Sequence, residues 1–298
     1  MKWQGVIPAI MTPFGDDLTV DADLLRREVD ALMKAGCAGI VALGSLGEGG
    51  SLSFEEKNAV LRLCREEIAG RGHLVAGVAA LTTKEAVRLA EQGTETGCDG
   101  LMVLPPYVYQ GDWRETRTHF EAVIGATSLP CLLYNNPIAY GTDVLPEQIR
   151  DLASALPNLA AVKESTTDVR RITAIRALLG DRLALLVGVD DVILEGVQAG
   201  AEGWIAGLAD ALPAESVRLF ELARDGRIDE ARALYEWFLP LLRLDTVPKF
   251  VQLIKLVQVE TGLGSEPVRP PRLPLVDPER AEVLKLIRDA LARRPKLQ

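Results

Sequence analysis

Lys163 is the residue whose surroundings most suggest covalent chemistry. It ends the apolar run Leu159-Ala160-Ala161-Val162 and is followed at once by the polar pair Glu164-Ser165. Such a run is typical of a strand covered on both faces, and lysine is almost never fully buried without a partner or a purpose. Burial disfavours the charged form of an amine, and a neutral amine can attack a carbonyl carbon to form a Schiff base. The alternative is structural: the lysine ends an edge strand and its ammonium group reaches water.

Three other segments carry groups that could act beside such a lysine. Residues 44–51 are glycine-rich and include Ser45, and closely spaced glycines can form a nest of backbone N–H groups that holds a carboxylate. Tyr134-Asn135-Asn136-Pro137 and Leu104-Pro105-Pro106-Tyr107 each bring a phenol to the end of an apolar run. Taken singly these signals are weak, because a glycine-rich loop is commonly only a turn and a tyrosine commonly only packs.

These segments belong to a regular alternation of short apolar runs and longer amphipathic ones. The predicted strands are residues 5–11, 39–43, 74–79, 100–104, 131–134, 160–163, 184–187 and 203–206. The predicted helices lie near residues 21–35, 53–69, 83–96, 112–126, 146–155, 167–179, 190–199 and 213–225. Eight strand–helix units predict an α/β fold with a parallel sheet, and the number fits a closed TIM (β/α)8 barrel of about 250 residues. In such a barrel the catalytic groups lie at the C-terminal ends of the strands.

An open doubly wound sheet is the competing fold. It would normally carry a G-x-G-x-x-G loop after its first strand. Here that strand leads into Met11-Thr12-Pro13-Phe14 instead, which favours the barrel.

Three helix-to-strand joints share one form, which also supports the barrel. They are residues 35–40, 96–101 and 199–204, and each contains a pair of glycines three positions apart. The first glycine suits the left-handed position after a helix, and the second permits close packing where the strand begins.

Beyond residue 225 the strand pattern stops. Apolar residues then recur at helical spacing, residues 262–274 form a connector rich in glycine and proline, and a last helix follows. We therefore predict a barrel domain over residues 1–225 and a C-terminal helical region over residues 226–298. This region shows no obvious chemistry.

The composition argues against several classes of function. The chain has 298 residues, a net charge of −9 and a pI near 5.0, which disfavours a nucleic-acid surface with clustered Lys and Arg. No apolar run approaches the roughly 20 residues needed to span a bilayer, so no membrane association is expected. The N-terminus lacks the pattern of a secretory signal peptide, which makes the cytoplasm the expected location.

The cysteines and histidines argue against a disulfide frame and a metal site. Four cysteines are scattered without a C-x-x-C pair, as expected for buried thiols in a reducing compartment. Only His73 and His119 are present, which disfavours a His-ligated metal and a Ser-His-Asp triad.

In their order along the chain, the motifs resemble those of the dihydrodipicolinate synthase / N-acetylneuraminate lyase family, a group of Schiff-base-forming barrel enzymes. The resemblance covers essentially the whole chain, and several ordered motifs make it specific. The matching segments are Pro8-Ala9-Ile10-Met11-Thr12-Pro13, Gly44-Ser45-Leu46-Gly47-Glu48, Tyr134-Asn135-Asn136-Pro137, Lys163-Glu164-Ser165, Gly188-Val189-Asp190 and Gly203-Trp204-Ile205-Ala206.

The resemblance implies the main catalytic roles. Lys163 would attack C2 of a 2-oxo acid or cyclic 2-imino acid, and the resulting iminium would serve as an electron sink. The Tyr134 phenol would carry protons near the Schiff base. Ser45, with its own backbone amide and that of Leu46, would bind the substrate carboxylate and pass a proton to Tyr134. No metal or organic cofactor is implied, because the lysine itself is the electrophilic device.

The resemblance also implies further substrate-binding positions. Gly188 would keep the mouth of the site open, and Ile205 would lend its backbone near the substrate carboxylate. The complete set of implied substrate-binding residues is Leu46, Ala9, Asn136, Gly188 and Ile205.

The chain departs from the synthase pattern in three places. Leu46 replaces the usual second hydroxyl of the glycine loop, and Tyr107-Val108 stands where the synthases carry two adjacent tyrosines. The turn Ile138-Ala139-Tyr140-Gly141 lacks the arginine that holds a second carboxylate in the synthases. These departures argue against dihydrodipicolinate synthesis. The loops after the last two strands hold Asp190, Asp191 and Asp210 rather than basic residues, which disfavours a phosphorylated substrate.

What remains is a small monocarboxylate that bears hydroxyls and is degraded rather than condensed. The motifs look like the branch associated with hydroxyproline breakdown, which deaminates 1-pyrroline-4-hydroxy-2-carboxylate to 2,5-dioxopentanoate and ammonia. The first alternative is dehydration of 2-keto-3-deoxy-L-arabonate, and the second is a retro-aldol lyase that releases pyruvate. A keto-acid-binding regulator without turnover belongs to a different class, and the presence of both Lys163 and Tyr134 weighs against it. The family resemblance further suggests a homo-oligomer, a tetramer or a dimer.

Overall fold

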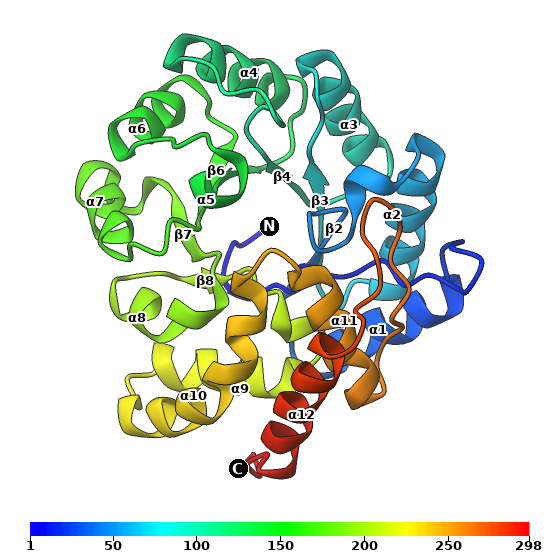
Figure 1. The fold of residues 1–298 in the computed structure, drawn as a ribbon. Coiled ribbons are helices and arrows are strands. Elements are labelled where there is room, and N and C mark those ends of the chain that lie inside the picture. The colour runs from blue at the N-terminus through cyan, green and yellow to red at the C-terminus, as the bar shows by residue number, and fades with distance from the viewer. Residues whose placement is uncertain (298) are drawn as a thin grey trace.

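The computed structural model describes residues 1–297, and its centre is a ring of eight parallel strands surrounded by helices (Figure 1). The strands are hydrogen-bonded in the order β1-β8-β7-β6-β5-β4-β3-β2. Their bounds are β1 Gly5–Val6, β2 Gly39–Ala42, β3 His73–Val78, β4 Gly100–Val103, β5 Cys131–Asn135, β6 Leu159–Glu164, β7 Ala184–Val187 and β8 Gly203–Trp204. Hydrogen bonds from Ala38 N to Val6 O and from Val41 N to Pro8 O join β2 to the segment that begins with β1, and so close the ring. The predicted TIM barrel is confirmed.

The first strand is much shorter than predicted. Residues 5–11 were expected to be extended throughout, but the regular ladder ends at Val6. Pro8 has no N–H to donate, so the segment cannot continue a regular ladder. Single hydrogen bonds from Ile7 N to Trp204 O and from Ala9 N to Ala206 O still hold it against the last strand.

Twelve helices are present in residues 1–297, and most start within two residues of their predicted positions. Their bounds are α1 Ala22–Lys34, α2 Phe54–Ile68, α3 Thr83–Glu95, α4 Trp113–Gly125, α5 Pro137–Tyr140, α6 Pro146–Ala155, α7 Arg170–Leu179, α8 Ile193–Gln198, α9 Pro213–Arg224, α10 Ile228–Leu242, α11 Phe250–Thr261 and α12 Glu279–Ala292. The helix expected at 190–199 is divided into a 3₁₀ turn, η3 (Asp190–Val192), and the shorter α8. The short helix α5, directly after the Tyr134 motif, was not predicted.

The repeated helix-to-strand joints have the geometry that the glycine pairs predict. The first glycine of each joint has a positive φ, which is +90° at Gly36, +75° at Gly97 and +105° at Gly200. A Cβ on Gly39, the second glycine of the first joint, would overlap the backbone oxygen of His73 in the neighbouring strand. The four cysteines are buried free thiols, as predicted.

The C-terminal helices α10, α11 and α12 lie over one side of the ring (Figure 1). Helix α10 packs against α9 and α8, and α12 packs against α10 and α11. A buried ion pair of 2.9 Å joins Lys255 Nζ in α11 to Glu48 Oε1 in the glycine-rich loop after β2. The C-terminal region therefore contacts the catalytic end of the barrel.

Within residues 1–297 no helix is long and apolar enough to cross a membrane. The same residues contain no group of three or more His, Cys, Asp and Glu side chains placed to hold a metal ion.

Candidate active site

Lys163 and Tyr134 face each other at the C-terminal ends of two neighbouring strands. Tyr134 of β5 and Lys163 of β6 are direct partners in the parallel register, so both side chains leave the sheet at the same level. Both are buried, at 7% and 6% exposure. Lys163 Nζ lies 4.0 Å from the centre of the Tyr134 ring. The two residues that the sequence predicts as nucleophile and proton carrier are therefore in contact, and both line one cavity.

Gly188 gives the Lys163 side chain its space. A Cβ at this position would lie 2.6 Å from Lys163 Cε and would overlap the Ser165 hydroxyl. Real Cβ atoms essentially never approach other heavy atoms so closely, so a larger residue would displace the lysine. Gly188 also lines the cavity.

A second phenol, Tyr140, completes a cluster of hydroxyl groups that the sequence analysis did not assemble. Tyr140 ends α5, and its hydroxyl lies 2.5 Å from Ser45 Oγ. Its ring packs edge-on against Tyr134, with ring centres 5.6 Å apart, and tilts against Tyr107, with ring centres 5.7 Å apart. Burial, followed by the neighbouring Tyr134, raises the pKa of the Tyr140 phenol well above its usual range.

This arrangement corrects the expected proton path. The family resemblance implied that Ser45 passes a proton directly to Tyr134, but the hydrogen-bond partner of the Ser45 hydroxyl is Tyr140. The sequence contained a signal for this residue, because Pro137 and Asn136 start a helical turn that ends at Tyr140.

Asn136 fixes the position of the Tyr134 phenol. Its side-chain amide donates a 3.1 Å hydrogen bond to the Tyr134 hydroxyl, and its side-chain oxygen accepts from Ala139 N at the start of α5. Asn136 also lines the cavity.

The glycine-rich loop after β2 presents free backbone amides. The N–H groups of Ser45 and Leu46 donate no hydrogen bond to any acceptor within residues 1–297, and both residues line the cavity. Thr12 Oγ1 holds the loop by donating a 2.7 Å hydrogen bond to Gly47 O. Free amides beside a serine hydroxyl form a suitable site for a carboxylate.

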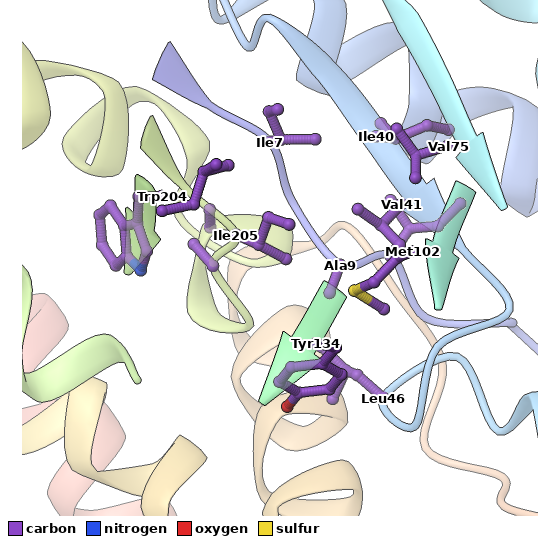
Figure 2. Packing of buried hydrophobic residues seen from close by; sticks show 14 of the residues in the cluster. Ile7, Ala9, Ile40, Val41, Leu46, Val75, Met102, Tyr134, Trp204 and Ile205 are labelled. Atoms are coloured by element: carbon purple, nitrogen blue, oxygen red, sulfur yellow. The ribbon is translucent and has the colours of Figure 1, made fainter. Parts of the chain in front are cut away.

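The inner wall of the cavity is apolar. Figure 2 shows Leu46, Met102 and Ala9 gathered near the Tyr134 ring, with Ile205 on the segment that follows β8. Ala9 and Ile205 are both in the expected wall, but the Ile205 N–H donates to Val187 O at 3.0 Å. Because this amide already has a partner, Ile205 does not offer it to a carboxylate.

The C-terminal region supplies the outer wall of the cavity, contrary to the expectation that it carries no obvious chemistry. The cavity has a volume of about 460 Å³ and is lined from this region by Asp245, Thr246, Val247, Pro248, Phe250 and Arg272. Asp245 lies in the 3₁₀ turn η5 (Arg243–Thr246), between α10 and α11. The sequence pattern did not predict this wall, because residues 82 to 109 positions beyond Lys163 reach the site only through the packing of the C-terminal helices and the connector that follows them.

Asp190 does not line the cavity, but its hydrogen bonds hold the backbone beside it. It is fully buried and accepts hydrogen bonds from Trp204 Nε1, Gly207 N and Leu208 N. Burial raises the pKa of this carboxyl to about 6, and the three donors act in the opposite direction. Asp190 thereby joins the turn after β7 to the end of β8.

On the outer face of β5 and β6, a polar network holds the two strand ends. Glu164 Oε2 accepts from Asn135 Nδ2 at 3.2 Å and from Arg171 Nε at 3.2 Å. Arg171 also donates to Asp143 Oδ1 at 3.0 Å and to Val144 O at 2.7 Å. Successive strand residues point to opposite faces, so fixing Asn135 and Glu164 outside directs Tyr134 and Lys163 inside.

Residues 2–290 match the family described as the Dihydrodipicolinate synthetase family. The chain belongs to this family. It is 31% identical over 292 residues to the 4-hydroxy-tetrahydrodipicolinate synthase of Methanothrix thermoacetophila, with 98% of this chain and 97% of the relative covered. It is 33% identical over 299 residues to the enzyme of the same name from Xanthomonas axonopodis pv. citri, with 98% and 96% covered.

Solved structures give the same result. The 4-hydroxy-tetrahydrodipicolinate synthase of Methylacidiphilum fumariolicum SolV superposes with a TM-score of 0.92 at 29% identity, over 98% of both chains. YagE, a prophage protein of this family from E. coli K12 solved in complex with pyruvate, gives a TM-score of 0.91 at 27% identity, over 98% of this chain and 99% of its own.

Family membership establishes the class of chemistry. Members are lyases of the class I aldolase type that form a Schiff base on a lysine, and this chain is such an enzyme. The family uses the covalent lysine adduct and no metal cofactor.

Proposed function

We propose that this enzyme deaminates 1-pyrroline-4-hydroxy-2-carboxylate to 2,5-dioxopentanoate and ammonia. Lys163 is the nucleophile, Tyr134 and Tyr140 carry protons, and Ser45 with the Leu46 amide binds the substrate carboxylate. Ala9, Asn136, Gly188 and Ile205 also line the cavity and would contact the substrate.

Tyr140 is the observation that carries the proposal. It lies in the turn where the synthases carry an arginine for a second carboxylate, and its phenol is bonded to Ser45. Ser45, Tyr107, Tyr134 and Tyr140 together surround the cavity with hydroxyl groups. Such a wall suits a substrate that bears a hydroxyl and one carboxylate better than a substrate that bears two carboxylates.

The chemistry follows from this arrangement. The Lys163 amine adds to C2 of the ring imine, and breakage of the bond between C2 and the ring nitrogen leaves a primary amine on C5. Loss of a C3 proton gives an enamine, and the 4-hydroxyl then leaves as water. A proton shift produces an imine at C5, whose hydrolysis releases ammonia, and hydrolysis of the lysine adduct gives the C2 ketone. The proton-carrying phenols stand beside the lysine where these transfers occur.

Dihydrodipicolinate synthesis is the main competing function, because the curated relatives described above carry that name. Arg272 brings a cation to the cavity, but it comes from the C-terminal connector and lies 3.8 Å from Glu48 Oε2. The cavity wall also includes the acidic Asp245. A carboxyl group at this part of the wall offers no cation to pair with a second substrate carboxylate.

Ammonia release tests the proposal. The purified enzyme should release ammonia from 1-pyrroline-4-hydroxy-2-carboxylate, and Lys163→Ala should abolish this activity. Condensation of pyruvate with aspartate semialdehyde should be at least about 10²-fold less efficient in kcat/KM, corresponding to about 2.7 kcal/mol of transition-state binding. A preference for the condensation, or no ammonia from the pyrroline, would refute the proposal.

Dehydration of 2-keto-3-deoxy-L-arabonate remains the first alternative, because it breaks the same C4–O bond and gives the same product. Turnover of both substrates should therefore be compared in one assay of 2,5-dioxopentanoate. Pyruvate release from either substrate would instead support the retro-aldolase. Borohydride with pyruvate should add mass to the Lys163 peptide, and an unmodified peptide would favour a binding protein without turnover.

We also propose that the enzyme is a homo-oligomer with a barrel domain at residues 1–225 and a helical region at residues 226–298. The apolar side chains Leu81, Val108 and Tyr109 are 70%, 77% and 55% exposed beside the cavity loops, which supports an interface there. A hydrogen bond from Tyr107 N to Ala80 O brings these loops together. Light scattering should give twice or four times the monomer mass of 32.3 kDa.

A further inference from the structure

Asp245 is a carboxyl group in the cavity wall that the family motifs do not include. It accepts no hydrogen bond and forms no ion pair with any group in residues 1–297. Its neighbour Arg243 is directed elsewhere, to Asp191 Oδ2 at 3.5 Å. Leu244, which lies between Arg243 and Asp245 in the sequence, is buried and anchors the turn. Packing therefore holds Asp245 at the cavity.

The Asp245 carboxyl can occupy this position because Gly207 has no side chain. A Cβ on Gly207 would overlap Asp245 Oδ1, so the carboxyl group lies directly against the backbone that follows β8. The turn η5 also packs against η3, which carries the buried Asp190. Contacts with the backbone after β8 and with η3 after β7 therefore place the carboxyl group over the ends of these two strands.

The surroundings favour the protonated form of this carboxyl. Burial, followed by the nearby Asp190, raises the pKa of Asp245 well above its ordinary value, and Lys163 acts in the opposite direction. A carboxyl group with a raised pKa holds its proton to a higher pH, and is therefore suited to general acid catalysis.

The position of Asp245 relative to the carboxylate site completes the geometry. The free amides of Ser45 and Leu46 follow β2, and Lys163 of β6 lies on the opposite side of the ring. Asp245 lies over the end of β8, on the arc that runs from β2 through β1, β8 and β7 to β6, and all of these residues line the same cavity. A substrate joined to Lys163 through C2, with its carboxylate on the glycine-rich loop, has its C3–C5 chain free to extend toward Asp245.

We propose that Asp245 is the general acid that protonates the departing 4-hydroxyl group of the substrate. In this step the enamine C2=C3 electron pair forms the C3=C4 bond, and the C4–O bond breaks. The proton of the Asp245 carboxyl goes to the leaving oxygen, which departs as water, and C2 becomes an iminium again. Solvent then returns a proton to the Asp245 carboxylate. The inference rests on the proposed function, because only a reaction that loses this hydroxyl needs the acid.

Asp245→Asn tests the step, with Asp191→Asn as the matched control, since Asp191 is a neighbouring acid outside the cavity lining. Asp245→Asn should lower ammonia release from the pyrroline substrate by about 10²–10⁴-fold. Deuterium exchange of the pyruvate methyl group and borohydride trapping of pyruvate should stay within about threefold, because they need only Lys163 and the proton-carrying phenols. Asp245→Glu should restore part of the activity, and Asp191→Asn should keep all three readouts near wild type.

The outcomes separate the two proposals. Ammonia release within about threefold of wild type in Asp245→Asn would overturn the role of Asp245 and leave the deaminase standing. A parallel loss of exchange and trapping would also overturn it, since that pattern indicates a disturbed site. If the wild type dehydrates 2-keto-3-deoxy-L-arabonate but leaves the pyrroline untouched, the deaminase fails, and the same comparison on dehydration decides the role of Asp245. If it does neither, both proposals fail.

Discussion

The neighbours of Lys163 determine the position of its side chain as well as the chemistry of its amine. Tyr134 covers one side of the amine, and the missing side chain of Gly188 leaves room on the other. An active lysine must keep its nitrogen within a few tenths of an ångström of the attacking position, because a displacement of about 1 Å can cost about 10²-fold in rate.

Gly188→Ala should therefore lower kcat/KM by about 10²-fold or more, because the new Cβ displaces Lys163. Borohydride trapping with pyruvate should fall in parallel. Gly125→Ala is the matched control, because nothing lies within 4 Å of a Cβ at that position at the end of α4. Normal trapping in Gly188→Ala would mean that the backbone relaxes and that the lysine is not positioned by this contact.

Tyr140→Phe removes the hydroxyl bonded to Ser45 while keeping the ring contacts. We expect kcat to fall by about 10²–10³-fold, because a positioned proton carrier typically contributes that much. The midpoint of thermal unfolding should change little. Tyr109→Phe serves as control, because its phenol is exposed and, in the part of the chain that the structure describes, hydrogen-bonds only to Glu115. Unchanged kcat in Tyr140→Phe would restore the direct path from Ser45 to Tyr134.

At the scale of elements, the barrel positions Lys163 and Tyr134, the proposed nucleophile and proton carrier, by fixing the adjacent strand residues that point to the opposite face. The network of Asn135, Glu164, Arg171 and Asp143 ties the ends of β5 and β6 to α7 and the segment before α6. Glu164 is nearly inaccessible, with 4% of its side chain exposed, and Arg171 is its ion-pair partner. Breaking a buried ion pair by removing one partner typically costs about 3–5 kcal/mol.

Arg171→Met should accordingly lower the free energy of unfolding by about 3–5 kcal/mol, measured by urea denaturation. It should also lower kcat, since the strand ends loosen. Arg170→Met is a neighbouring control on the same helix. Arg170 is 88% exposed and, among residues 1–297, pairs only with Asp168, so its loss should cost no more than about 1 kcal/mol. Equal losses in the two variants would show that the network does not hold the strands.

At the scale of the molecule, buried charges join the barrel to its C-terminal region. Asp210 follows β8, is almost fully buried and accepts from Met11 N at 2.8 Å. Lys255 of α11 lies near it and also donates to Thr12 O at 3.0 Å. The N-terminal segment, the end of β8 and α11 therefore meet around one set of charges.

Asp210 should make the stability depend on pH. Burial raises the pKa of its carboxyl from 3.8 to about 7 in the folded protein. The native state then keeps a proton that the unfolded state releases above its lower pKa, so this contribution to stability falls as pH rises from about 4 to 7. Asp210→Asn does not titrate, so its free energy of unfolding relative to wild type should improve across this window by several kcal/mol, since each pKa unit is worth about 1.4 kcal/mol. A constant difference from pH 4 to 8, measured by denaturant unfolding, would contradict this.

The sequence by itself determined the barrel and the strand order along the chain, and it indicated that Lys163 and Tyr134 lie at the ends of neighbouring strands. Apolar runs and helical spacing are local patterns, and a lysine or a tyrosine at the end of an apolar run is visible without knowing what lies opposite. The motif order also indicated the family to which the chain belongs. The early end of β1 at Val6 also follows from a local feature, because Pro8 has no N–H to donate.

Only the tertiary structure decided which distant residues share the cavity. Ser45 and Tyr140 are 95 positions apart, and their contact exists because β2 and β5 end at the same mouth of a closed ring. Asp245 and Arg272 reach that mouth from helices and a connector that the sequence presented as an appendage. Sequence periodicity does not predict these contacts between distant residues, because they result from the way the ring closes and the C-terminal helices pack on it.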